Sequence, residues 1–223
     1  MYTRFGIDER DSNGVITTYV YNKKKAEDFY YLLVGLNLKD LKKFLIDMEL
    51  NILNQKESLI KKDVDAYNFL LSEDYDLAHT IDVRYPYLLR NSVFTSTYTL
   101  LENALNTVCK FYTQNSGCQS NIKNSKIAII ESAKEFIEKE MGVKLSEKEW
   151  HLITQYRFVR NAIVHSSGYI STSGERAVRK LNDRGVNLNK QRVIKLDNTA
   201  CIQFIELVEL FLLNLCNDLP FLD

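Results

Sequence analysis

The chain has 223 residues, which is enough for one domain with a substantial core, with or without a helical extension. Hydrophobic residues make up 45% and charged residues 26%, with only 8 Gly and 2 Pro, which excludes a disordered or low-complexity chain. The 29 basic and 29 acidic residues balance, so the net charge indicates no polyanionic partner.

The charge distribution is more informative than the net charge. Between Trp150 and Lys195 the only acidic residues are Glu175 and Asp183, whereas residues 196–223 carry five acidic residues and no Lys or Arg. A basic segment is usually a solvated face, and it favours nucleic-acid binding only when a chemical site lies within it. The basic residues of this segment are Arg157, Arg160, Arg176, Arg179, Lys180, Arg184, Lys190, Arg192 and Lys195.

The cysteines and the apolar runs indicate where the protein is located in the cell and whether it holds a metal. The four cysteines form no Cys-x-x-Cys pair and have no His at metal-ligand spacing, so we expect no zinc site. The first ten residues carry charges where a signal peptide needs apolar residues, and no run approaches the roughly 20 apolar residues of a membrane helix. We therefore expect a cytoplasmic protein with reduced thiols and no membrane partner.

Residues 1–85 are predicted to form an N-terminal helical extension, and the alternative that they belong to the same domain as residues 86–223 stays open. A turn at 11–14 followed by Val-Ile-Thr-Thr-Tyr-Val-Tyr predicts a short strand or hairpin. Helical spacing then runs from about Lys23 to Ile60, with Asn37 as a possible interruption. A further amphipathic segment, about 62–79, is expected to end before Asp82 to Pro86, because the residue before proline disfavours the α conformation.

Residues 86–223 are predicted to form the main domain, which is helical. Helices are expected from Pro86 to about Thr113, from about Asn121 to Met141 before Gly142, and from the capping box at 146–149 to about His165. After Gly168, residues 169–174 and 191–196 are expected to pair as a small β-hairpin around a short helix at 176–181. The last helix, about 199–217, is apolar enough to be largely buried.

The helix ending at His165 carries the candidate chemistry. At about 100° per residue, Leu152, Tyr156, Val159 and Ile163 form the predicted core stripe, with Ile153 and Ala162 at its edges. Asn161 and His165 are four residues apart and share the opposite face, with Arg157 one turn earlier. Arg160 lies about 140° from His165 on this wheel, so a strictly helical segment would separate their side chains. Two arrangements would bring the groups together: the helix ends at His165 and swings this side chain across, or a second copy of the helix supplies the missing group.

The hexapeptide Arg160-Asn-Ala-Ile-Val-His165 resembles the signature of the HEPN superfamily, an Arg, a polar residue, a short apolar spacer and a His. The motif ends a helix, Gly168 follows soon after it, and Glu102 in an earlier helix resembles the acidic residue of that family. The similarity covers roughly residues 86–217. It implies an all-α fold, a HEPN-like antiparallel helical bundle with a small β-hairpin insertion near 168–196.

The resemblance implies RNA cleavage without a metal or another cofactor, by attack of a 2′-OH on the adjacent phosphodiester to leave a cyclic phosphate. His165 is expected to move protons and Arg160 to stabilise phosphate charge, so both are the predicted catalytic residues. Asn161 is expected to orient His165 or to bind phosphate, and Arg157 to add a phosphate contact. Tyr169 after Gly168 is a candidate for base stacking, and Glu102 completes the predicted substrate-binding set.

The family commonly sets two motifs face to face, which would also bring together the side chains that the wheel separates. We therefore expect a homodimeric endoribonuclease in a toxin or phage-defence role, with an antitoxin or regulatory protein as a possible partner. Two alternatives remain open: a non-catalytic HEPN module that binds a nucleotide, nucleic acid or protein, and a plain helical interaction protein in which the motif is a coincidence. Without Arg160 and Asn161 beside it, His165 would be interpreted as a charge that favours a helix C-terminus, and Glu102 could as easily be a solvated or salt-bridged residue as a site residue.

Overall fold

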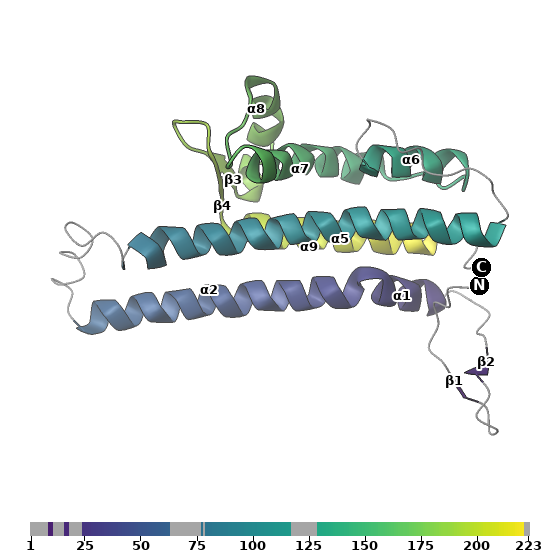
Figure 1. Cartoon of the computed structure of the whole chain (residues 1–223), viewed down its shortest axis with the longest axis horizontal. Coiled ribbons are helices and arrows are strands. Elements are labelled where there is room, and N and C mark those ends of the chain that lie inside the picture. Colours follow the sequence, from purple (N-terminus) through teal and green to yellow (C-terminus); the bar gives the residue numbers. More distant parts are fainter. Residues whose placement is uncertain are drawn as a thin grey trace. The chain divides into compact units, whose positions relative to one another are not determined.

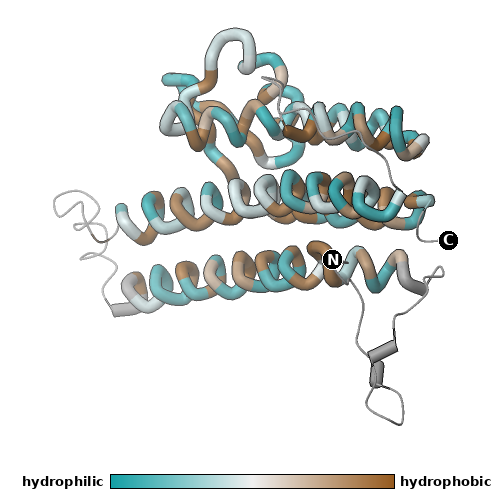
Figure 2. The backbone as a smooth tube through the Cα atoms, turned by 45° about the vertical axis from the view of Figure 1, so that its right-hand side comes forward, coloured by the Kyte–Doolittle hydropathy of each residue, from teal (hydrophilic) through white to brown (hydrophobic). Residues whose placement is uncertain are grey.

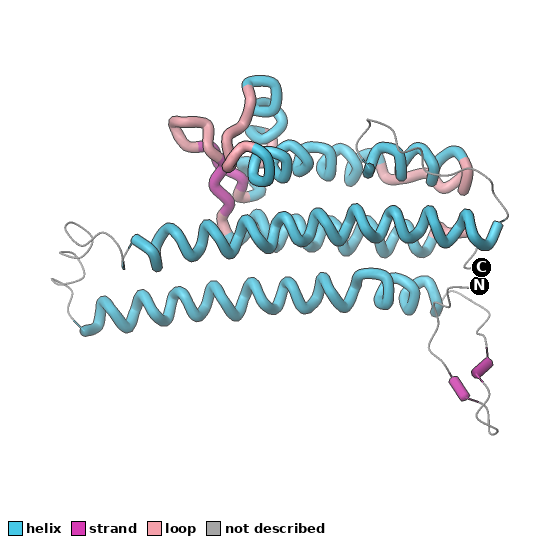
Figure 3. Tube along the Cα trace, viewed as in Figure 1, coloured by secondary structure: helices cyan, strands magenta, loops and turns pink. Residues whose placement is uncertain are grey.

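The structure, a computed structural model, is built mainly of α-helices with two small hairpins (Figure 3). It describes residues 9–10, 16–17, 24–62, 77, 79–116 and 129–220. The chain divides into two compact units, which we describe separately. Unit 1 comprises Met1–Leu38, Thr99–Trp150 and Leu207–Asp223, and unit 2 comprises Lys39–Tyr98 and His151–Glu206. Both units contain residues from each side of position 85, so the predicted boundary at that position stays a prediction.

The first elements of the chain agree with the predicted pattern. Strands β1 (Glu9–Arg10) and β2 (Ile16–Thr17) pair antiparallel, which confirms the predicted hairpin. Helix α1 (Lys24–Tyr30) passes through one π-helical stretch, η1 (Tyr31–Gly35), into the long helix α2 (Leu36–Lys62). Asn37 therefore does not interrupt the helix. The segment predicted at 62–79 lies almost wholly outside the described residues.

The expected break before Pro86 is wrong. Residues Thr80–Arg84 form a π-helical stretch, η2, that joins helix α5 (Tyr85–Ser116) directly, and the Tyr85 N–H donates to Thr80 O. Pro86 is thus the second residue of α5 but lies within a continuous helical segment, where it supplies no N–H to a carbonyl of the preceding turn. The preference of a pre-proline residue against the α conformation is a local bias, and the continuation of the helix outweighs it here.

Helices α6 (Ile129–Lys139) and α7 (Glu147–His165) are separated by the stop and start signals that the sequence predicts. Gly142 adopts φ of 72°, the left-handed conformation in which glycine is favoured, and so ends the α6 region. The Ser146 hydroxyl accepts from the Glu149 N–H at 3.5 Å, as the capping box predicts. Residues 121–128 of the predicted helix lie outside the described part of the chain.

Unit 1 has an apolar core formed by aromatic contacts between helices. Phe29 of α1 packs against Phe111 of α5 with ring centroids 5.6 Å apart, and Trp150 of α7 packs against Phe211 of α9 (Asn198–Asn217) at 5.9 Å. Residues of α6 join this core, since Tyr112 meets Phe136 edge to face. Aromatic pairs of this kind add to the burial of apolar area in holding helices together.

Unit 2 has a second aromatic core. The Phe204 ring of α9 lies 4.8 Å from Phe94 and 4.5 Å from Tyr156, and it stacks on Tyr98 at 6.2 Å. These four side chains are buried and come from α5, α7 and α9. Ion pairs join Glu49 of α2 to Arg90 of α5 and Lys56 of α2 to Asp82 of η2, so α2 runs antiparallel to this part of the chain (Figure 1).

The insertion after α7 differs in part from the prediction. Helix α8 (Thr172–Arg179) begins earlier than expected, because the Ser171 hydroxyl caps it by accepting from the Gly174 N–H. Strand β4 (Ile194–Leu196) pairs mainly with β3 (Val186–Leu188), a strand that the pattern did not indicate, after a 3-10 turn, η3 (Asn182–Arg184). The predicted pairing with residues 169–174 is reduced to one bridge, Tyr169 with Val193.

Helix α9 is the apolar helix that the sequence predicted to be largely buried, and its inward residues are buried. It is also long and apolar enough to cross a membrane by length and composition, contrary to our expectation from the sequence. A buried core helix meets the same two criteria. Figure 2 shows apolar and polar residues interspersed along the long helices α2 and α5, as expected of helices with one buried face.

Candidate active site at the end of helix α7

Helix α7 presents the motif on its solvent side. Ile153, Tyr156, Val159 and Ala162 are buried, whereas Leu152 and Ile163 are only half-buried. The buried stripe is therefore rotated slightly from the predicted one, towards the residues that we placed at its edge. Asn161 and His165 are both exposed, which confirms that these two side chains face away from the core.

Backbone geometry explains why α7 ends at His165. Ser167 and Gly168 both adopt positive φ, 49° and 84°, which a continuing α-helix does not allow. The N–H groups of Ser166 and Gly168 both donate to Ala162 O, at 3.0 and 2.8 Å. The residues that follow the helix therefore provide hydrogen-bond donors for a carbonyl of its last turn. His165 thus lies at the final position of the helix, beside a tight turn.

The structure brings Arg160 and His165 together within one chain. Arg160 Nη1 lies 3.1 Å from His165 Nε2 and 3.2 Å from Asn161 Oδ1. The wheel argument, which separated Arg160 from His165, is therefore wrong for these side chains. An arginine side chain is long enough to reach across the helix surface, so the angle between Cβ directions does not decide where its guanidinium lies. A second protomer is not needed to form this contact.

The contact also indicates which group donates. Arginine carries only hydrogen-bond donors, so His165 Nε2 accepts this bond through its lone pair. An imidazole whose lone pair lies beside a guanidinium has the two groups that a proton transfer next to a phosphate requires.

The Arg160 guanidinium also contacts an aromatic ring of another helix, which the sequence did not indicate. Its guanidinium carbon lies 5.8 Å from the ring centroid of Tyr98, a buried residue of α5. A cation over an aromatic face is held electrostatically by the ring quadrupole. The sequence shows Tyr98 only as one tyrosine in a predicted helix, and no sequence pattern relates it to Arg160.

The other predicted site residues are less closely grouped. Arg157 lies one turn before the motif, with its guanidinium over the Phe158 ring at 5.9 Å, and is half-buried. Tyr169 is 56% exposed in the turn after α7. Glu102 lies on α5 in unit 1, whereas the motif belongs to unit 2, so the role predicted for Glu102 stays a prediction.

Two other features of the described residues lie apart from the motif. No group of three or more His, Cys, Asp or Glu that could hold a metal ion is present in the part of the chain that the structure describes. A pocket of about 260 Å³ is lined by residues of unit 1, among them Val143, Glu149 and Asn214, and by no residue of the motif. The motif is an open surface site.

Comparisons with protein-family models, with curated proteins and with solved structures find no match to this chain.

Proposed function

We propose that the chain is a metal-independent endoribonuclease of HEPN type, with Arg160 and His165 as its catalytic residues. The observation that supports this most directly is the 3.1 Å contact between Arg160 Nη1 and His165 Nε2 at the exposed end of α7. A permanent cation and an imidazole at that distance match the needs of phosphodiester cleavage, in which one group binds the phosphate and the other moves a proton.

In the proposed reaction, the RNA phosphate competes with His165 and Asn161 for the N–H donors of Arg160. A guanidinium forms stronger, bidentate bonds to phosphate than to a neutral imidazole, so binding of the substrate frees the Nε2 lone pair. His165 then accepts the proton of the 2′-OH, the 2′-oxygen attacks phosphorus, and the bond to the 5′-oxygen breaks. The 5′-oxygen leaves as a 5′-OH by taking a proton from solvent, and His165 later returns the proton of the 2′-OH to solvent, so the products are a 2′,3′-cyclic phosphate and a 5′-OH. Arg160 stabilises the negative charge that develops on the nonbridging phosphate oxygens.

The test is cleavage of mixed single-stranded and structured RNA in the presence of EDTA. We expect the wild type to cleave with cyclic phosphate ends, and His165→Ala and Arg160→Ala to lose cleavage. His151→Ala is a matched control, because His151 is an exposed histidine on the same helix and contacts Gln155 rather than the motif. Wild-type protein that binds RNA without cleaving any member of a broad panel would favour the non-catalytic module instead.

A homodimer remains part of the proposal, supported now by the resemblance alone, since Arg160 and His165 meet within one chain. Mass in solution tests it directly, and a strict monomer that cleaves RNA would remove the dimer while leaving the nuclease. The toxin or defence role is tested by expression in cells. Growth arrest by the wild type, relieved in His165→Ala, would support that role and would allow a search for an antitoxin.

A further inference from the structure

We propose that Tyr87 and Tyr169 form a stacking site for unpaired bases beside the motif, so that the substrate is single-stranded RNA or an unpaired loop. The inference rests on the proposed function, because it takes RNA as the ligand. It adds Tyr87, a residue that the sequence did not single out, and it names the structural class of the substrate.

The two tyrosines come from distant parts of the chain and meet at one turn. The Tyr87 hydroxyl of α5 would lie 3.5 Å from a Cβ placed on Gly168, and Tyr169 is the next residue. Tyr87 is 38% exposed and Tyr169 is 56% exposed, and both belong to unit 2. Partly exposed aromatic side chains near one turn are the residues on which unpaired bases stack.

The turn between the tyrosines is held by backbone bonds to two other segments. Gly168 N–H donates to Ala162 O of α7 at 2.8 Å, and Gly168 O accepts from Ile194 N–H of β4 at 2.9 Å. Ile170 N–H donates to Arg192 O at 3.1 Å. A site on a turn fixed in this way keeps its geometry before the ligand arrives, which lowers the entropic cost of binding.

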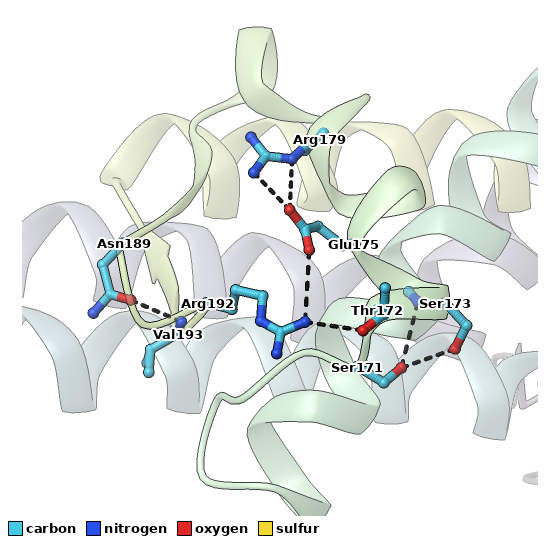
Figure 4. Close-up of polar contacts among 9 residues, drawn as sticks. Ser171, Thr172, Ser173, Glu175, Arg179, Asn189, Arg192 and Val193 are labelled. Carbon is cyan, nitrogen blue, oxygen red and sulfur yellow. Dashed lines mark hydrogen bonds and ion pairs between the residues drawn. The ribbon is translucent and has the colours of Figure 1, made fainter.

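A cation from the β3–β4 hairpin lies next to this turn. Figure 4 shows the Arg192 side chain running from the hairpin towards α8, where Arg192 Nη1 donates to Thr172 Oγ1 at 2.9 Å and lies 3.9 Å from Glu175 Oε2. The same insertion carries the exposed cations Arg176, Lys180, Lys190 and Lys195, which have no ion pair within the described residues. Aromatic faces combined with cations are the usual composition of surfaces that bind single strands.

The site is close to the proposed reaction. Gly168 follows His165 by three residues, so their Cα atoms are at most about 11 Å apart. A base held by the tyrosines therefore belongs to a nucleotide near the scissile bond. The faces of bases inside a duplex are covered by their neighbours and cannot stack on a protein side chain, which is why this surface selects unpaired RNA.

The experiment measures binding without cleavage, in a His165→Ala background. A short single-stranded RNA containing 2-aminopurine reports stacking by fluorescence quenching, and a duplex of the same sequence is the comparison. We expect Tyr87→Leu and Tyr169→Leu each to weaken single-strand binding about tenfold and to reduce quenching, while Tyr87→Phe and Tyr169→Phe retain both. Duplex binding should be weaker and should not respond to these variants.

Tyr85→Leu is the matched control, because Tyr85 is exposed on the same helix but lies two residues, or about 200°, from Tyr87. Equal binding by the wild type and both Leu variants would overturn the inference. Loss of binding in Tyr87→Phe as large as in Tyr87→Leu would also overturn it, because a packing role of the hydroxyl would then explain the effect.

The two proposals can fail separately. Cleavage of RNA by the otherwise wild-type chain, unaffected by the tyrosine variants, would remove the stacking site and leave the nuclease. Tyrosine-dependent binding of single strands by a chain that cleaves no RNA would remove the nuclease and leave the stacking site.

Discussion

Arg160 and His165 are in direct contact, with Nη1 and Nε2 3.1 Å apart at the last turn of α7. This contact leads to a prediction about charge and shape. Arg160→Lys keeps the cation but loses the planar fork that binds two phosphate oxygens, so we expect kcat to fall about a hundredfold with a smaller change in KM. Steady-state cleavage of a defined RNA measures both constants. Wild-type kcat in the Lys variant would show that only the charge matters.

A measurement of stability shows whether the fall in kcat of an Arg160 variant comes from lost chemistry or from unfolding. Arg160 is half-buried and its guanidinium lies over the Tyr98 ring, so loss of this side chain should lower the free energy of unfolding by less than about 1 kcal/mol. Urea unfolding of Arg160→Lys and Arg160→Ala checks this. A much larger loss would mean that the residue holds the fold, and the cleavage data would then need another explanation.

Asn161 gives a second prediction. Its Oδ1 accepts from Arg160 Nη1 at 3.2 Å, so Asn161→Asp places a carboxylate against the guanidinium. The carboxylate would compete with the RNA phosphate for the same donors and repel it, and we expect KM to rise about tenfold while the fold is unchanged. Asn161→Ala is the control, because it removes the acceptor without adding a charge. An Asp variant with the same KM as the Ala variant would contradict this reasoning.

A third prediction concerns the fork between Arg90 and Glu49 in unit 2. Arg90 Nε and Nη2 donate to the two Glu49 oxygens at 2.6 and 2.9 Å, and Arg90 Nη1 donates to Leu196 O, so one side chain joins α2, α5 and β4. Glu49 raises the pKa of Arg90 through this hydrogen bond, opposed by burial. Glu49→Gln should lower the free energy of unfolding by about 1 to 3 kcal/mol, measured in urea.

The matched control for this pair is on the surface. Lys139 and Glu135 form an ion pair at 2.7 Å on α6, with both side chains more than half exposed. Glu135→Gln should leave stability unchanged within error, because exposed pairs are screened by solvent and salt. Equal destabilisation by Glu49→Gln and Glu135→Gln would contradict the importance given to burial and to the third bond, to Leu196.

The fourth prediction is a loss of stability in alkali. Burial raises the pKa of the Cys109, Cys201 and Cys216 thiols from 9.0 to about 12, and it raises the pKa of the Tyr156 hydroxyl to about 12, partly offset by Arg184. The folded state therefore keeps these protons after the unfolded chain has released its own. The stability linked to the thiols is fully present below about pH 9 and is lost between pH 9 and about 12, whereas the loss linked to Tyr156 begins at about pH 10. Each group contributes up to about 1.4 kcal/mol per pH unit within its window.

Denaturant unfolding at a series of pH values measures this loss. Cys201→Ala should reduce the slope of the free energy of unfolding against pH above pH 9, because the proton of this thiol is then no longer linked to folding. Thiol-reactive reagents provide a second readout, since the three cysteines are buried and should react only after unfolding. A slope that is identical in Cys201→Ala would contradict the assignment of this proton to Cys201.

Much of the helical structure could be predicted from the sequence, because amphipathic spacing and end signals are local. The helices at 85–116, 147–165 and 198–217 match the predicted ones to within a few residues. The exposed face with Asn161 and His165 was also predictable, since residues four apart share a face on any α-helix. The pairing of β3 with β4 was not, because a three-residue strand leaves too short a pattern to read.

The sequence by itself therefore determined where the helices run and which residues carry the candidate chemistry. Only the tertiary structure decided how that chemistry is assembled. The reach of the Arg160 side chain to His165, its position over Tyr98, and the meeting of Tyr87 with the turn at Gly168 all depend on segments that are distant in sequence or on long, flexible side chains. Periodicity fixes the direction of a Cβ, but it does not fix where a guanidinium ends or which helix lies beside it.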